Sequence, residues 1–207
     1  MLNKKNILWI LLFGTLIGLN ETLIGSFKIP YRAVILSTIT ITLLSIAARQ
    51  IPKIGTSTLV ILIAVIFKLN NMGFATCTVN VFFCGPSAIL LLGIGYEAFS
   101  SLLNRKITNN YLKLVLICGL TSIAAFTIFG IMNTYILNSW NESMFSVYLL
   151  SRAPMTVLAS GALSIFVLFL FKTFRNYNIA RLNPYVINSA VVCMIIAIWL
   201  FGTFTQL

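Results

Sequence analysis

The sequence contains no histidine and only three acidic residues among its 207 positions. The absence of histidine excludes imidazole metal sites, histidine general bases and Ser-His nucleophile pairs. Three carboxylates are too few for a clustered carboxylate metal site, and no phosphate-binding P-loop with its lysine is present. We therefore expect that the chain is not an enzyme and that it holds no metal and no cofactor.

Apolar residues dominate the remaining sequence: 59% of the chain is hydrophobic and 8% is charged. A soluble domain of this size cannot bury so much apolar surface. The apolar residues fall into repeated runs, separated by short polar or basic segments, and such runs are typical of bilayer-spanning helices. The sequence therefore predicts an all-α, polytopic integral membrane protein with six to seven transmembrane helices in one bundle, and residues 1–207 form a single transmembrane helical domain.

The polar breaks divide the chain into seven predicted helices. We expect them over residues 7–25, 33–48, 56–68, 85–103, 111–137, 149–171 and 185–204. The first run follows a basic start but lacks a clean small-x-small cleavage site, so we expect a retained helix and not a signal peptide. The third is short for a full span, which predicts a tilted or partly re-entrant segment.

The distribution of basic residues predicts the orientation. With the amino terminus in the cytoplasm, ten of the fourteen lysines and arginines fall on the inner side. This bias follows the positive-inside rule, and seven helices then place the carboxyl terminus outside. The four basic residues on the outer side are Lys28, Arg32, Lys68 and Arg152. We expect a multi-pass protein of the plasma or inner membrane.

The charged residues near the outer surface allow two interpretations. Glu21 lies in an apolar run one turn below that surface, and ionisable residues in such runs default to functional sites. The basic residues either reach lipid headgroups with their long side chains or, together with Glu21, line an outward-facing site for an anionic or zwitterionic small molecule. The second interpretation predicts a set of ligand contacts, with three aromatic residues that close over it. The contacts are Glu21, Arg32, Lys68, Asn70, Asn71, Asn80 and Arg152, and the covering residues are Phe74, Phe82 and Phe83.

Small residues on the first helix predict a close helix–helix contact. Gly14, Gly18 and Gly25 share one face, and glycines at such intervals let helices approach closely in lipid. This face is either a packing seam alone, or one on which Glu21 also points into a polar cavity. Glu97, in the fourth apolar run, either pairs with Arg105 two turns further on or contacts a partner.

The four cysteines are expected to differ in role. Cys118 and Cys193 lie in apolar runs and are most simply packing residues. Cys77 and Cys84 flank one loop, and a disulfide between them requires that the loop lies outside the cytoplasm.

The central stretch GTSTLVILIAVIFKLNNMG, followed by a loop and GPSAILLLGIGYEAFSSLL, resembles the substrate-binding membrane subunits (S components) of energy-coupling factor transporters. The resemblance covers mainly residues 7–105. Those small proteins, usually built from six helices, capture a vitamin or related micronutrient from outside, while a separate transmembrane subunit and two ATPases drive uptake. For this chain the resemblance implies a small organic ligand, a transmembrane coupling subunit and ATPases as partners, and packing of Gly14, Gly18 and Gly25 against the coupling subunit.

Two features depart from that family. A seventh helix places the carboxyl terminus outside, whereas the six-helix form keeps both ends inside. The absence of histidine disfavours the metal-binding branch, which leaves an organic ligand.

Two other functions stay open on the sequence. One is a membrane-embedded enzyme acting on a lipid or prenyl substrate, which the lack of histidine and the scarcity of carboxylates disfavour. The other is a non-catalytic assembly or sensory protein. No nucleic-acid partner is expected, because the basic residues punctuate apolar runs and form no patch.

Overall fold

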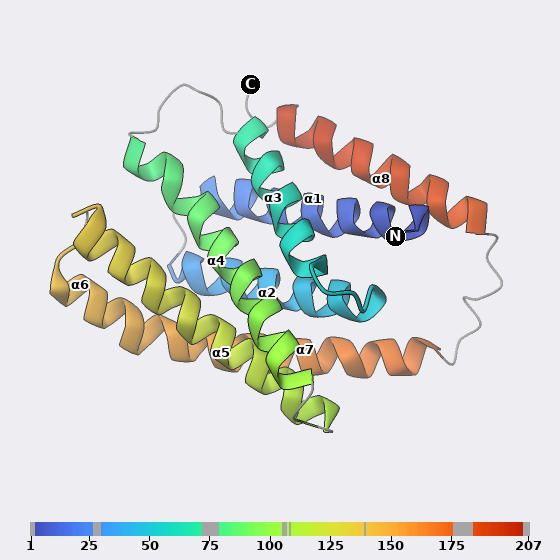
Figure 1. Cartoon of the computed structure of the whole chain (residues 1–207). Coiled ribbons are helices and arrows are strands. Elements are labelled where there is room, and N and C mark those ends of the chain that lie inside the picture. The colour runs from blue at the N-terminus through green and yellow to red at the C-terminus, as the bar shows by residue number, and fades with distance from the viewer. Residues whose placement is uncertain are drawn as a thin grey trace.

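The structure, a computed structural model, describes residues 3–26, 30–71, 79–104, 107, 109–138, 140–175 and 184–204. In these ranges all regular structure is helical (Figure 1). The elements are α1 (Lys4–Ser26), α2 (Arg32–Gln50), α3 (Thr56–Asn71), α4 (Val79–Asn104), α5 (Asn110–Ile131), η1 (Met132–Ile136), α6 (Glu142–Val147), η2 (Tyr148–Arg152), α7 (Ala153–Arg175) and α8 (Pro184–Phe204). The segments η1 and η2 are π-helical.

The helices of the described chain join into seven continuous rods, which confirms the predicted all-α class. η1 continues α5, and η2 links α6 to α7 without a break. Two predicted starts are wrong. Gly85-Pro86 was expected to open the fourth helix, but α4 begins at Val79 and contains Pro86 in its interior. The sixth rod begins at Glu142 and not near Leu149, because the side chain of Asn141 caps it by accepting from the Met144 N–H.

Within the described residues, five helical segments are long and apolar enough to cross a membrane, as expected of a polytopic membrane protein. They are Lys5–Ile24, Arg32–Gln50, Gly85–Asn104, Asn110–Ile136 and Glu142–Leu170. Two shorter apolar helices, Thr56–Asn70 and Asn188–Leu200, accompany them. Large apolar side chains point away from the bundle, among them Leu150 and Leu158 at 76% and 74% exposure, which suits a surface that faces lipid.

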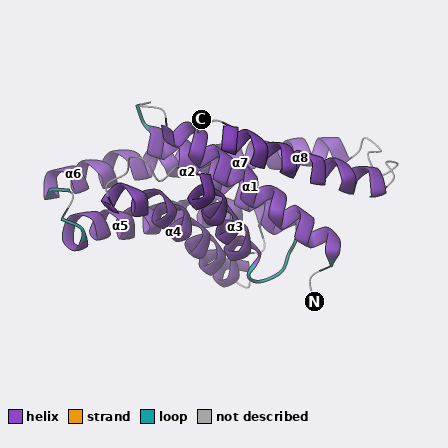
Figure 2. Cartoon of the chain, turned by 90° about the horizontal axis from the view of Figure 1, so that it is seen from above, coloured by secondary structure: helices purple, strands orange, loops and turns teal. Residues whose placement is uncertain are grey.

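The rods form one bundle with two ends. α1 packs against α2, α3 and α8, while α5 lies between α4 and α7 (Figures 1 and 2). The turn at Ile54, between α2 and α3, marks the end of the bundle that was predicted to be cytoplasmic. The turn before Asn141 marks the opposite end. These are called the Ile54 end and the Asn141 end below.

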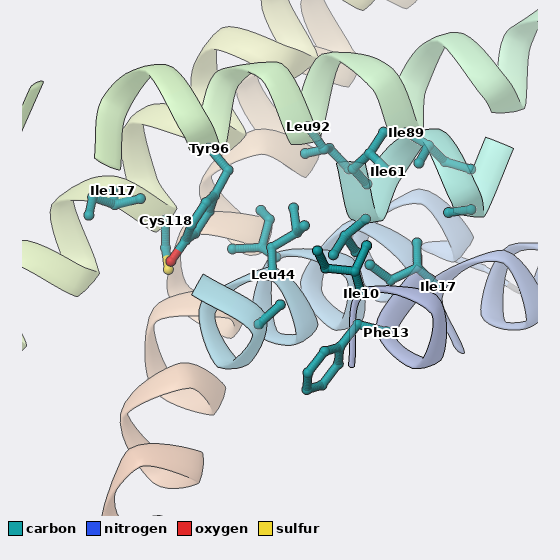
Figure 3. Packing of buried hydrophobic residues seen from close by; sticks show 14 of the residues in the cluster. Ile10, Phe13, Ile17, Leu44, Ile61, Ile89, Leu92, Tyr96, Ile117 and Cys118 are labelled. Atoms are coloured by element: carbon teal, nitrogen blue, oxygen red, sulfur yellow. The ribbon is translucent and has the colours of Figure 1, made fainter. Parts of the chain in front are cut away.

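The apolar core lies where α1 to α5 meet. Ile17, Leu44 and Ile61 are almost fully buried there, and Figure 3 shows Leu44 and Ile61 within this cluster. A second, smaller cluster attaches α8, where Phe67 of α3 meets Trp199 edge to face with ring centroids 4.9 Å apart.

The glycine face of α1 lies against α3. A Cβ atom on Gly14 would stand 2.6 Å from Ile63 Cβ and 2.7 Å from the carbonyl oxygen of Val60, and one on Gly18 would stand 2.7 Å from the Phe67 ring. Such close approach is what small residues permit. The seam at these two positions is therefore filled within the chain itself. Binding of a partner there stays a prediction, and it would require α3 to move aside.

Candidate functional site

A buried ion pair joins α1 and α3 toward the Asn141 end of the bundle. Lys68 Nζ donates to Glu21 Oε1 at 2.5 Å, and the side chains are only 6% and 12% exposed. Both residues were predicted as ligand contacts. Their pairing places two full charges where α1, α3 and α4 meet.

The glycine seam explains why these two side chains meet. Glu21 follows Gly18 by almost one turn, and Lys68 follows Phe67, the residue packed on Gly18. Close contact between the backbones thus brings the two side chains together. Gly85 of α4 closes the third side: a Cβ atom there would overlap Lys68 Nζ and would lie 3.0 Å from Glu21 Oε1. Only glycine leaves room for the ammonium group at this position.

Burial of the Glu21–Lys68 pair costs free energy, because both charges leave water. Removing two charges from water costs several kcal/mol for each ion, and their mutual attraction returns this only with close geometry. The short Nζ–Oε1 contact supplies such geometry. The pair presents a charged acceptor and a charged donor in a buried junction, so it can recognise a ligand that carries either sign.

The other predicted ligand contacts come from several helical segments. Arg32 is exposed at the start of α2, and Asn70 is exposed near the end of α3. Asn71 and Asn80 lie in α3 and α4, but their side chains are outside the described part, as are the side chains of Phe82 and Phe83. Phe74 is outside the described residues altogether, and so is Lys28.

Arg152 belongs to an aromatic cluster that the sequence did not predict. Its guanidinium carbon lies 5.2 Å from the centre of the Tyr148 ring, a cation–π geometry. Tyr148 also packs on Phe126 and Trp140, with ring centroids 5.0 and 4.7 Å away. Tyr148 and Arg152 belong to η2, and the Trp140 N–H donates to the carbonyl oxygen of Asn133 in η1, so both π-helical segments border this cluster; such segments are frequent at functional sites. Within η1, the Thr134 hydroxyl is buried with no hydrogen-bond partner.

Glu97 caps the first turn of α3 from a distant position in the chain. The Gly55 N–H donates to its Oε1 at 2.8 Å, and the Ser57 N–H donates to its Oε2 at 2.9 Å. The first amide groups of a helix lack partners within the helix and carry positive charge, so a carboxylate is well placed there. Arg105, its predicted partner, lies outside the described residues. Contact between Glu97 and another protein stays a prediction.

A basic pocket of about 340 Å³ opens beside Glu97 at the Ile54 end. Its charged lining consists of Arg49, Lys53, Lys113 and Glu97, from α2, the following turn, α5 and α4. The sequence predicted these cations only as contributors to the positive-inside bias. The sequence did not predict that these three cations lie around one cavity, because that depends on the packing of three separate segments.

Below this pocket a polar chain crosses four helices. The Tyr96 hydroxyl is hydrogen-bonded to Ser45, whose Oγ lies 3.9 Å from Cys118 Sγ. Cys118 in turn donates to Ser164 at 3.7 Å. Figure 3 shows the Tyr96 hydroxyl directed at Cys118. These contacts join α4, α2, α5 and α7 beneath the cavity and give it a fixed floor.

The three cysteines other than Cys118 take no part in these polar contacts among the described residues. Cys193 is free and exposed on α8, so its predicted packing role is wrong. Cys77 lies outside the described residues, and the side chain of Cys84 is also not described. Their disulfide stays a prediction.

Metal ligands do not gather in the part of the chain described here: no three His, Cys, Asp or Glu side chains lie together in it. A comparison with protein-family models, with curated proteins and with solved structures found no match to this chain.

Proposed function

We propose that this chain is the substrate-binding membrane subunit of an uptake transporter for a vitamin-like organic molecule. The observation that carries the proposal is the Glu21–Lys68 ion pair, buried at the junction of α1, α3 and α4. Charged residues inside membrane bundles are expensive, and they mark substrate or ion pathways by default. The resemblance of residues 7–105 to the S components of energy-coupling factor transporters supports the same class.

In this proposal the ion pair exchanges its internal contact for contacts with the ligand. A carboxylate of the ligand accepts from Lys68 Nζ, and a protonated nitrogen of the ligand donates to Glu21. Because each ligand group replaces a partner of the same sign, no charge is left buried alone during the exchange. Arg32, Asn70, Asn71, Asn80 and Arg152 are the further ligand contacts, and apolar walls supply most of the remaining surface.

The proposal requires partners that supply energy. The sequence has no P-loop motif, so separate ATPase subunits and a transmembrane coupling subunit drive the transport. The protein lies in the plasma or inner membrane with its amino terminus in the cytoplasm, as the positive-inside bias favours. Because α3 covers Gly14 and Gly18, docking of the coupling subunit on this face involves a separation of α1 from α3.

The experiment begins with the protein purified from its native membrane. Mass spectrometry identifies co-purified proteins and any small molecule released on denaturation. The released molecule is then titrated into wild type, Glu21→Gln and Lys68→Met, with Glu142→Gln and Lys5→Gln as controls at exposed positions. We expect the two site variants to lose roughly 2–4 kcal/mol of binding free energy, on the scale of a truncated buried charge pair. Equal affinity in all five proteins contradicts the site, and recovery without ATPases contradicts the transporter class.

A further inference from the structure

The basic pocket at the Ile54 end differs in chemistry from the ion pair. It measures about 340 Å³ and is lined by three cationic side chains, Arg49, Lys53 and Lys113, against one carboxylate, Glu97. Arg49 and Lys53 are exposed, and Lys113 is half-buried, so an occupant can approach from outside the bundle.

The Glu97 carboxylate in this pocket already accepts two hydrogen bonds from the backbone. Both oxygens of Glu97 accept backbone N–H groups at the start of α3, at 2.8 and 2.9 Å. Its charge therefore also compensates the positive end of that helix, in addition to the cations across the pocket. The lining keeps an excess of two positive charges, and an anion in the cavity relieves their mutual repulsion.

The remaining lining suits an oxygen-rich anion. Asn104 and Asn110 bring side-chain amides, whose N–H groups can donate to the oxygens of an anion. Guanidinium and ammonium groups together bind phosphate oxygens strongly, because the hydrogen bonds are charge-assisted. Basic pockets between membrane helices on the cytoplasmic side take phosphate-bearing headgroups. The Tyr96–Ser45–Cys118–Ser164 contacts hold the floor of the pocket in place.

We propose that this pocket binds a phosphate group, carried either by an anionic phospholipid headgroup or by a soluble phosphate compound. It is a second site, at the opposite end of the bundle from the Glu21–Lys68 pair, and it does not depend on the function proposed for that pair.

The test titrates three probes into the full-length protein in a neutral detergent. The probes are inorganic phosphate, dihexanoyl phosphatidic acid, and dihexanoyl phosphatidylcholine as the zwitterionic comparison. The variants are Arg49→Gln and Lys113→Gln, with Lys113→Arg as the charge-retaining variant. Lys5→Gln is the matched control, since it removes the same charge from an exposed position outside the pocket. Circular dichroism establishes that each variant is folded.

The expected result is binding of at least one anionic probe that falls by about tenfold in Arg49→Gln and in Lys113→Gln, as the loss of one charged hydrogen bond predicts. Lys113→Arg and Lys5→Gln are expected to keep the wild-type affinity. Binding of inorganic phosphate identifies a soluble source, and binding of phosphatidic acid alone identifies a lipid source. Absence of anion binding, equal binding of phosphatidylcholine, or an equal loss in Lys5→Gln overturns the proposal.

Discussion

Three residues at the junction of α1, α3 and α4 contribute in different ways, two through charge and one through its small size. Glu21 and Lys68 neutralise one another, and Gly85 leaves the space that the ammonium group fills. The sequence predicted Glu21 and Lys68 as unusual, because an ionisable residue in an apolar run stands out. It did not predict that they pair with one another, since that depends on the approach of two helix backbones. Gly85 carried no signal beyond a predicted helix start.

A double-mutant cycle tests the coupling within this ion pair. Glu21→Gln or Lys68→Met alone leaves one buried charge without its partner, so each is expected to lower the free energy of unfolding by about 3–5 kcal/mol. The double variant is expected to cost clearly less than the sum of the two, because no charge is left. Denaturation in mixed micelles measures all four proteins. Strictly additive effects would show that the two side chains do not depend on one another.

Glu97 permits a prediction about the start of α3. Glu97→Gln keeps one oxygen but replaces the other with an amide nitrogen, which cannot accept from a backbone N–H. We expect a loss of about 1–2 kcal/mol in unfolding free energy. Faster hydrogen exchange is expected at the Gly55 and Ser57 amides, the two groups that Glu97 binds. Glu142→Gln is the control, as an exposed glutamate at the start of α6. Unchanged exchange at both amides would contradict the capping role.

At the scale of elements, the sequence predicted the number of helices in the described chain correctly but missed the start of α4 and the two π-helical segments. Long apolar runs bounded by basic or polar residues gave seven helices, and the described chain has seven rods. The start of α4 was predicted too late, because proline is favoured in the first turn of a helix, whereas Pro86 lies in the interior of α4. The π-helical segments η1 and η2 had no signal in the apolar pattern, since each extends a helix without changing its composition.

The contact between α1 and α3 is the element-scale feature that is easiest to test. Gly14→Ala adds a methyl group against Ile63, a β-branched side chain, and against the Val60 carbonyl oxygen, neither of which can move freely. Gly119→Ala is a matched control in α5, where the nearest atom to the added carbon is Val157 Cγ1 at 3.4 Å. Both changes raise helix propensity alike.

We therefore expect Gly14→Ala to lower the unfolding free energy by about 1–3 kcal/mol through overpacking, and Gly119→Ala to leave it unchanged or slightly higher. Thermal denaturation in detergent compares the two with wild type. A similar midpoint for all three would mean that α1 and α3 adjust to the added methyl group, and that the seam is looser than its distances indicate.

At the scale of the whole molecule, charge is divided between two ends. The Asn141 end has the buried pair of opposite charges, and the Ile54 end has a cavity with excess positive charge. The sequence predicted the bias in basic residues but not the cavity. Counting residues along a chain assigns them to a side of the membrane, whereas a cavity requires that Arg49, Lys53 and Lys113 converge from separate elements. That convergence follows only from the packing of the helices.

The two ends also allow the predicted orientation to be tested. Ile54, which is 86% exposed, and Asn109 lie at one end of the bundle. Asn138 lies at the opposite end. Single cysteines are introduced at these three positions in a chain whose four native cysteines are replaced by serine. With the amino terminus inside, a membrane-impermeant maleimide is expected to label Asn138→Cys on intact cells, and Ile54→Cys and Asn109→Cys only after permeabilisation. Labelling of all three from outside would contradict the helix count. The reverse pattern would keep the seven rods but invert the protein, which would move the ion pair to the cytoplasmic side, where it cannot capture a ligand from outside.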